Sequence, residues 1–209
     1  MQDAVRRLTV HTPRTQTGSR RPEDQGDMIL SKAISTVSEA DLSLMRKINQ
    51  WPAPRWVRLC MLSSTRGGDG WFWALCGVAL LASHEPEKSA ALLAAAIAAA
   101  SGILVFTVLK RAVNRRRPCE LEPHCWATLL PPDQFSFPSG HSITAFAVAI
   151  PLSLFYPLIA PVLLCVAAMI ALSRIMLGMH FLTDVVAGSA IGSGLGIAAY
   201  YVVAHNAVL

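Results

Sequence analysis

Long apolar runs alternate with short polar segments through the last two thirds of the chain. Three runs approach the roughly 20 apolar residues that an α-helix needs to cross the hydrocarbon core of a bilayer, and they cover residues 90–109, 158–172 with its flanks, and 185–203. Two shorter runs cover residues 71–83 and 143–155, and the latter extends to about residue 158 through Pro157. The pattern predicts an all-α fold, a polytopic membrane helical bundle with about five transmembrane helices.

The first 70 residues follow a different pattern. Residues 1–27 are rich in Arg, Thr, Gln, Pro and Asp, and we expect a disordered basic tail there. Segments 38–49 and 55–63 favour amphipathic helices that lie at the membrane surface, and the first of them opens with a capping sequence. A glycine-rich stretch at 67–70 then breaks the chain. We therefore predict a tail (1–27), interfacial helices (28–69) and a membrane-embedded domain (70–209).

Composition supports a membrane protein. Of 209 residues, 53% are hydrophobic and 15% are charged, which exceeds the hydropathy of a soluble fold of this size. A soluble bundle of buried helices is the alternative. The first 27 residues contain no apolar core, so we expect no cleavable signal peptide. The bilayer is the expected partner; we expect no nucleic acid, and the oligomeric state stays open.

Charged and polar residues of the membrane portion fall at the ends of the predicted spans. A charge at the centre of a spanning helix costs about 2.5–3.5 kcal/mol, so its placement is informative. Because successive spans alternate in direction, the ends of spans two and four and the starts of spans three and five share one membrane face. Four segments thus bring eight residues to one surface, namely Lys110, Arg117, Ser139, Gly140, His141, Arg174, His180 and Asp184.

The local chemistry of these residues favours a phosphate site. Ser139 and Gly140 lead into a helix N-terminus, where free backbone N–H groups and the helix dipole bind anions. Arginine can bind two phosphate oxygens at once. His180 and Asp184 are four residues apart and adjoin if they share a helix, so the carboxylate can hold one imidazole nitrogen and leave the other as a nucleophile or base.

Simpler interpretations exist for single features. The basic cluster 110–117 alone favours a membrane-stop signal. Asp184 alone could complement the N-terminus of its helix. His124, between Cys119 and Cys125, suggests zinc, but the spacing matches no strong ligand pattern, and we predict neither a metal nor a cofactor. The convergence of four segments, rather than any one of them, favours a catalytic site.

Three motifs in this convergence resemble those of a known family. They are K-x6-R-P at Lys110 to Pro118, P-S-G-H at 138–141, and S-R-x5-H-x3-D at 173–184, in order and within about 75 residues. Together they resemble the type 2 phosphatidic acid phosphatase and vanadium haloperoxidase superfamily. The resemblance implies an all-helical core and metal-independent hydrolysis of a phosphate ester or anhydride.

The resemblance also implies a role for each motif residue. His180 would attack phosphorus to give a phosphohistidine, and Asp184 would keep its imidazole oriented and basic. His141 would protonate the leaving oxygen and then help to activate water. Three cations, with Ser139 and the Gly140 N–H, would hold the phosphoryl oxygens, and these cations are Lys110, Arg117 and Arg174.

The expected substrate is a lipid phosphate, because the site lies where a lipid head group lies. The short chain resembles small bacterial undecaprenyl diphosphate phosphatases, and phosphatidate or phosphatidylglycerophosphate is the alternative. Haloperoxidases of the superfamily are water-soluble, unlike this chain. A non-catalytic lipid-phosphate-binding protein is the competing class; the pair His180 and Asp184, with His141, argues against it because binding alone needs only cations.

Two arguments about orientation oppose each other. With five spans, 17 of the 18 lysines and arginines lie on the catalytic side, which the positive-inside rule would place in the cytoplasm. The family precedent for undecaprenyl diphosphate places it in the periplasm of a bacterial inner membrane. We leave the orientation open and favour the precedent. In a periplasmic loop, Cys119 and Cys125 could form a disulfide, whereas in the cytoplasm they would remain thiols.

Overall fold

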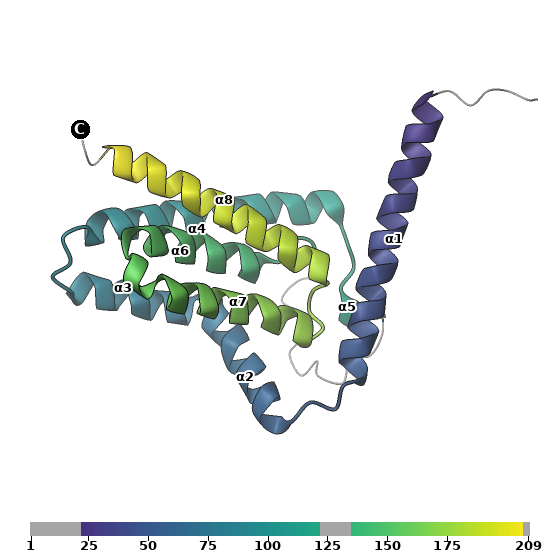
Figure 1. Cartoon of the computed structure of the whole chain (residues 1–209), viewed down its shortest axis with the longest axis horizontal. Coiled ribbons are helices and arrows are strands. Elements are labelled where there is room, and N and C mark those ends of the chain that lie inside the picture. The colour runs from purple at the N-terminus through teal and green to yellow at the C-terminus, as the bar shows by residue number, and fades with distance from the viewer. Residues whose placement is uncertain (1–21, 122–134, 207–209) are drawn as a thin grey trace, which may run out of the picture. The chain divides into compact units, whose positions relative to one another are not determined.

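The computed structural model describes residues 22–121 and 135–206, and within these ranges helices are the only regular elements (Figure 1). The predicted all-α membrane fold is confirmed. The chain divides into two compact units, residues 1–38 and 39–209, and each is described by itself. In the first unit, the described residues are the N-terminal part of helix α1. The second unit contains all other described elements and the whole candidate site.

Helix α1 (Pro22–Gln50) begins within the segment expected to be disordered. Residues 22–27 of that segment are helical, whereas residues 1–21 lie outside the described residues. The start is physically reasonable, because a proline followed by two acidic residues is typical of the first turn of a helix. The predicted amphipathic segment 38–49 is therefore the last part of a longer helix.

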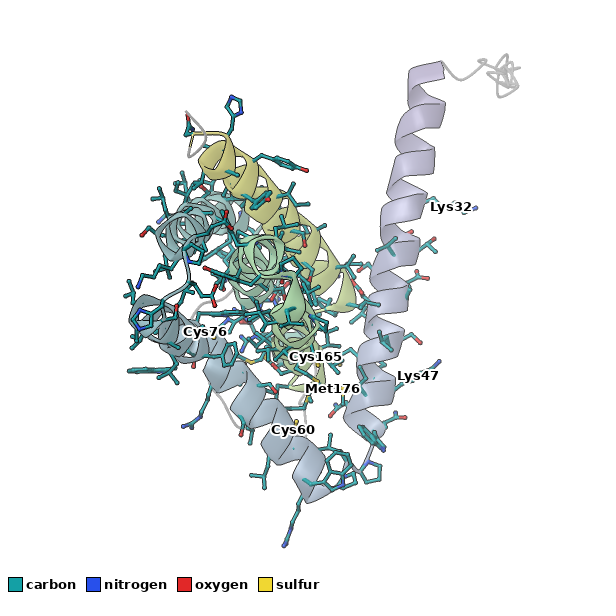
Figure 2. The ribbon with its side chains drawn as sticks, turned by 60° about the vertical axis from the view of Figure 1, so that its left-hand side comes forward. Lys32, Lys47, Cys60, Cys76, Cys165 and Met176 are labelled. Carbon is teal, nitrogen blue, oxygen red and sulfur yellow. The ribbon has the colours of Figure 1, made fainter. Side chains whose placement is uncertain are left out.

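The predicted second interfacial helix is α2 (Arg55–Arg66), which packs on the end of α7 (Ala160–Met176). An apolar cluster joins them, in which buried Met61 and Met176 contact partly buried Cys60; Figure 2 labels the latter two residues. The glycine stretch forms the wide turn η1 (Gly67–Trp71), where Gly70 has a φ of 110°. L-residues with a side chain rarely adopt that conformation, so glycine is needed there. Helix α3 (Phe72–Ala82) follows directly.

Among the described residues, three helices are long and apolar enough to cross a membrane. They are α4 (Lys88–Val113), the continuous segment Pro157–Met176 and α8 (Leu182–Asn206). The segment Pro157–Met176 comprises the 3-10 turn η2 (Pro157–Ile159) and α7. Helix α6 (Gly140–Phe155) is apolar but shorter. It does not continue through Pro157, because Tyr156 leaves the helical conformation (φ −127°, ψ 73°) and Pro157 is the first residue of the next turn.

Helix α6 contacts α4, α7 and α8, and these helices run side by side (Figure 1). Small residues allow the close approach of α8 to α6. A Cβ on Gly188 would lie 2.8 Å from the carbonyl oxygen of Ser139, and one on Gly192 would lie 3.0 Å from Cα of Ile143. Small residues four apart are a common means of close helix packing in membranes. They bring the N-terminal ends of α6 and α8 together, where the Ser139 N–H donates to the Asp184 carbonyl at 3.1 Å.

Large apolar side chains on the outer faces of the membrane helices are exposed in the isolated chain. Examples are Leu75, Leu104, Val162, Val186 and Tyr201. A soluble protein rarely exposes so many large apolar groups, whereas lipid tails cover them in a bilayer. This surface excludes the soluble-bundle alternative.

Candidate active site

A cavity of about 460 Å³ lies where the helix ends converge. Six of the eight predicted residues line it: Lys110, Arg117, Gly140, His141, Arg174 and His180. The other two, Ser139 and Asp184, are fully buried. The predicted convergence is therefore present in the fold.

Helix ends position the phosphate-binding candidates. Lys110 lies in the last turn of α4, which ends at Asn114 in the left-handed conformation. Arg117 then precedes the short helix α5 (Pro118–Leu121). Ser139 caps α6, and its Oγ accepts hydrogen bonds from the backbone N–H and the hydroxyl of Ser142. Gly140 is the first residue of α6, so its N–H is one of the groups that a helix leaves unpaired at its start.

Two guanidinium groups are buried in the cavity wall. Arg117 is 1% exposed, and its Nη1 donates to the carbonyl of Met179 at 2.8 Å. Arg174 is 3% exposed and donates to the hydroxyl of Thr65 from α2. Two buried cations in the wall of a cavity make it chemically suited to an anion. Lys110 lies nearby, with Nζ 5.4 Å from the centre of the Phe106 ring.

His180 lies in the turn between α7 and α8, after Gly178, whose φ is 67°. The imidazole is 2% exposed, and its Nδ1 lies 2.6 Å from the carbonyl oxygen of Ser136. A carbonyl can only accept a hydrogen bond, so Nδ1 carries the proton and Nε2 has the lone pair. Arg117 Nη1 donates to that Nε2 at 3.2 Å.

Asp184 lies beside the imidazole of His180, as its spacing predicted, but the two residues make a longer contact than a direct hydrogen bond. The nearest approach is 3.8 Å, between Nδ1 of His180 and Oδ2 of Asp184. The two residues do not share a helix, because α8 begins at Leu182. Oδ2 of Asp184 instead accepts from the Phe181 N–H at 2.9 Å, and the carboxylate lies close enough to act on His180 by its charge.

Burial determines the protonation of His180. Removal from solvent lowers the pKa of its imidazole to about 3, and the positive charges of Arg174 and Arg117 lower it further, against the opposing effect of Asp184. His180 is therefore neutral at physiological pH, with an Nε2 lone pair directed to the arginine side of the cavity. A neutral imidazole of this kind is a competent nucleophile.

His141 has a partner that the sequence did not predict. Its Nε2 lies 2.7 Å from Oδ1 of Asp69, which belongs to the turn η1. A Cβ on Gly68 would lie 3.0 Å from Cδ2 of His141, so the turn packs tightly against the ring. Asp69 thus occupies one imidazole nitrogen and leaves Nδ1 for another group. An acidic residue in a glycine-rich break beside an apolar run was the only available signal.

Other residues that contact the candidate site also belong to no sequence motif. Ser136 holds His180 through a backbone carbonyl, which any residue could supply. Arg115, Thr183 and Asp41 surround Asp184 and are described further below. Cys119 is a free cysteine in α5, whereas Cys125 and His124 lie outside the described residues, so the possible disulfide stays a prediction.

Comparisons with known proteins identify the family of this chain. Residues 90–207 match the family model of the PAP2 superfamily. The chain is 35% identical over 144 residues to decaprenylphosphoryl-5-phosphoribose phosphatase of Mycobacterium tuberculosis, which covers 65% of this chain and 77% of that protein. It is 34% identical over 107 residues to phosphatidylglycerophosphatase B of Bacillus subtilis, covering 43% of this chain and 46% of that protein.

Two solved membrane structures share the fold. The PAP2 type phosphatidylglycerolphosphate phosphatase from Bacillus subtilis aligns with a TM-score of 0.63 and 26% identity, over 82% of this chain and 89% of that chain. LpxE from Aquifex aeolicus aligns with a TM-score of 0.61 and 28% identity, over 76% of this chain and 93% of that chain. With its membrane helices and its converged motifs, this chain belongs to the PAP2 superfamily and is a membrane phosphatase related to bacterial lipid phosphatases.

Proposed function

We propose that this protein hydrolyses a lipid phosphate without a metal ion, through a phosphohistidine on His180. One observation carries the proposal: a buried neutral imidazole turns its Nε2 lone pair toward a cavity with two buried arginines. A cationic wall suits the phosphate itself, whereas it would repel a divalent metal ion. The proposal therefore assigns the stabilisation of phosphate charge to side chains alone.

In the first step, Nε2 of His180 bonds to phosphorus and the bond from phosphorus to the leaving oxygen breaks. Arg117 transfers its hydrogen bond from Nε2 to a phosphate oxygen, which frees the lone pair. His141 starts as an imidazolium whose Nε2–H donates to Asp69; it gives its Nδ1 proton to the leaving oxygen and becomes neutral. In the second step, His141 takes a proton from water, the water oxygen bonds to phosphorus, and the bond from phosphorus to Nε2 breaks.

Five groups hold the transferring phosphoryl oxygens in this proposal. Lys110, Arg117 and Arg174 line the cavity and supply positive charge. The Gly140 N–H and the Ser139 hydroxyl supply neutral donors at the start of α6. Such fixed donors stabilise the charge that develops in the transition state, and they need no rearrangement during the reaction.

The proposed substrate is a polyprenyl-linked phosphate. Beyond the cations, the cavity is lined by apolar residues of α3, α4 and α6, namely Trp73, Ala99, Ile103, Phe106 and Val148. These residues suit a hydrocarbon tail that enters from the bilayer. The mycobacterial relative is named for a decaprenyl lipid, and undecaprenyl diphosphate has the same kind of tail. The second candidate is phosphatidylglycerophosphate, which the solved Bacillus subtilis relative is named for.

We further propose that the protein lies in the bacterial inner membrane with the catalytic face in the periplasm. The support is the precedent of undecaprenyl diphosphate phosphatases. The distribution of basic residues favours the opposite orientation. Several of those basic residues belong to the proposed site, so their charge has a second explanation there.

An assay of purified protein in detergent micelles tests the substrate and the metal independence together. With excess EDTA, the protein should release phosphate from a polyprenyl-linked phosphate, and phosphatidate and phosphatidylglycerophosphate should have a kcat/KM at least about tenfold lower. His180→Gln should abolish turnover and any trapped phosphoenzyme. Activity that disappears with EDTA and returns with magnesium would refute metal independence, and a preference for a diacyl lipid would refute the polyprenyl assignment.

A further inference from the structure

Asp184 is held by a chain of charged residues that begins on α1. Arg115 Nη1 donates to Oδ1 of Asp184 at 2.6 Å, and Arg115 Nη2 donates to Oδ2 of Asp41 at 2.7 Å. Asp41 is 4% exposed and Asp184 is fully buried, while Arg115 is partly buried over the Phe181 ring at 4.1 Å. One guanidinium group thus joins two carboxylates from helices α1 and α8.

Asp41 also holds the start of α8. Its Oδ1 accepts from the Thr183 N–H at 3.2 Å, and its Oδ2 accepts from the Thr183 hydroxyl. The same hydroxyl accepts from Arg115 at 2.7 Å. A carboxylate at a helix start pairs the free N–H groups and complements the dipole. Here a residue distant in sequence caps the helix that begins two residues after His180.

The charges of Asp41, Arg115 and Asp184 do not cancel. Two carboxylates and one guanidinium leave one net negative charge, and the nearer carboxylate lies 3.8 Å from Nδ1 of His180. If Arg115 paired Asp184 alone, the two charges would neutralise each other. Asp41 balances Arg115, so that Asp184 keeps its effect on the imidazole. The imidazole gains positive charge when Nε2 bonds to phosphorus, and a negative charge beside it stabilises that state.

We propose that Asp41 and Arg115 are positioning residues for His180, and that they act through Asp184; this rests on the proposed phosphohistidine mechanism. The last part of α1 then belongs to the catalytic core. A structural anchor alone would change the stability of the protein but leave the imidazole of the folded molecule as it is. A positioning role changes both the rate of the chemical step and the environment of His180.

The test compares Asp41→Asn with Glu39→Gln, an exposed residue of the same helix, and Arg115→Lys with exposed Arg116→Lys. Full-length protein in detergent micelles is assayed with undecaprenyl diphosphate and phosphatidylglycerophosphate. Small displacements of a reacting group cost up to about a hundredfold in rate, so we expect Asp41→Asn to lower kcat at least about tenfold with little change in KM. Arg115→Lys cannot bridge both carboxylates and should behave in the same way, and the double variant should cost no more than the worse single variant.

A second measurement does not depend on turnover. The ¹⁵N resonance of His180 Nδ1 is identified by its loss in His180→Gln and then followed in each variant. Asp41→Asn and Arg115→Lys should shift it, and the two controls should not. An unchanged resonance in both, or an unchanged kcat in both, would overturn the proposal. If the wild-type protein hydrolyses neither lipid, the proposed function fails, while the resonance alone still decides whether Asp41 and Arg115 position His180.

Discussion

Burial links the stability of the protein to the protonation of His180. The pKa of this imidazole is about 3 in the folded protein against 6.5 for a solvated histidine, because the charged form would lose its hydration. Between these two pH values the unfolded chain binds a proton that the folded chain excludes. The stability contribution is therefore fully present above pH 6.5, and it is lost as the pH falls toward 3.

Each pH unit in this window corresponds to about 1.4 kcal/mol for one group, so lowering the pH from about 7.5 to about 5 should cost the wild-type protein about 2 kcal/mol through His180. Over the same change of pH, the variant His180→Gln should lose about 2 kcal/mol less stability than the wild-type protein. Thermal unfolding in detergent at both pH values measures the difference, and His205→Gln, an exposed residue near the other end of α8, is the control. Equal losses in His180→Gln and the wild-type protein would contradict the burial argument.

Asp69 should affect how strongly the rate of hydrolysis depends on the leaving group. It holds Nε2 of His141 at 2.7 Å and fixes the ring that is proposed to donate the proton. General acids contribute about 10²–10⁴ in rate, and the contribution is largest for poor leaving groups. Asp69→Asn should therefore slow the hydrolysis of alkyl phosphates by at least about tenfold, and the hydrolysis of aryl phosphates much less. A series of leaving groups measures this, with exposed Glu120→Gln as the control; equal slowing of the whole series would exclude this role for Asp69.

At the scale of elements, the packing of α8 on α6 places the two helix starts of the candidate site. Gly192 and Gly194 lie in the same helix, but a Cβ on Gly192 would meet the Ile143 backbone, whereas one on Gly194 would have nothing within 4 Å. Overpacking costs about 1–3 kcal/mol, so Gly192→Ala should lower the midpoint of thermal unfolding and the activity. Gly194→Ala should leave both unchanged or raise the midpoint, since alanine favours a helix. Two variants with equal midpoints would refute this account of the packing.

The sequence predicted helix ends better than side-chain contacts. Apolar runs and alternating helix direction were enough to bring Lys110, His141 and His180 to one face, because the membrane forces each span to cross it. Contacts between distant segments had no such constraint. Nothing in the sequence pairs Asp69 with His141, or Asp41 with Arg115. The four-residue spacing of His180 and Asp184 did place the two side chains beside each other, although they do not share a helix, since Gly178 turns the chain and α8 begins only after His180.

At the scale of the whole molecule, within the part of the second unit that the structure describes, the basic residues of the membrane portion lie at the catalytic ends of the helices, except for Lys88 at the start of α4. Lys88 Nζ donates to the carbonyls of Leu81 and Ser83, so it also satisfies carbonyl groups at the C-terminal end of α3. The positive-inside rule counts residues by location and not by role. Buried Arg117 and Arg174 face the cavity, where a phosphate would neutralise them. The charge asymmetry is therefore weaker evidence for a cytoplasmic catalytic face than the residue count suggests.

Cys119 allows a direct test of the orientation. It lies in α5 next to Pro118, on the catalytic side of the bundle, and burial raises the pKa of its thiol. A variant that keeps only Cys119, with the other four cysteines replaced by alanine, is treated in spheroplasts with a membrane-impermeant maleimide at mildly alkaline pH. A second variant places the only cysteine at exposed His84, between α3 and α4 at the opposite end of the bundle.

A periplasmic catalytic face predicts that Cys119 reacts in intact spheroplasts and that His84→Cys reacts only after permeabilisation. The reverse pattern would refute the proposed orientation, and it would favour an enzyme that acts on lipids of the inner leaflet. Because the two positions lie on opposite membrane faces, each variant serves as the control for the other. If the membrane protected Cys119, His84→Cys would react in intact spheroplasts. A slow reaction at Cys119 without that reaction at His84→Cys therefore does not indicate a cytoplasmic catalytic face.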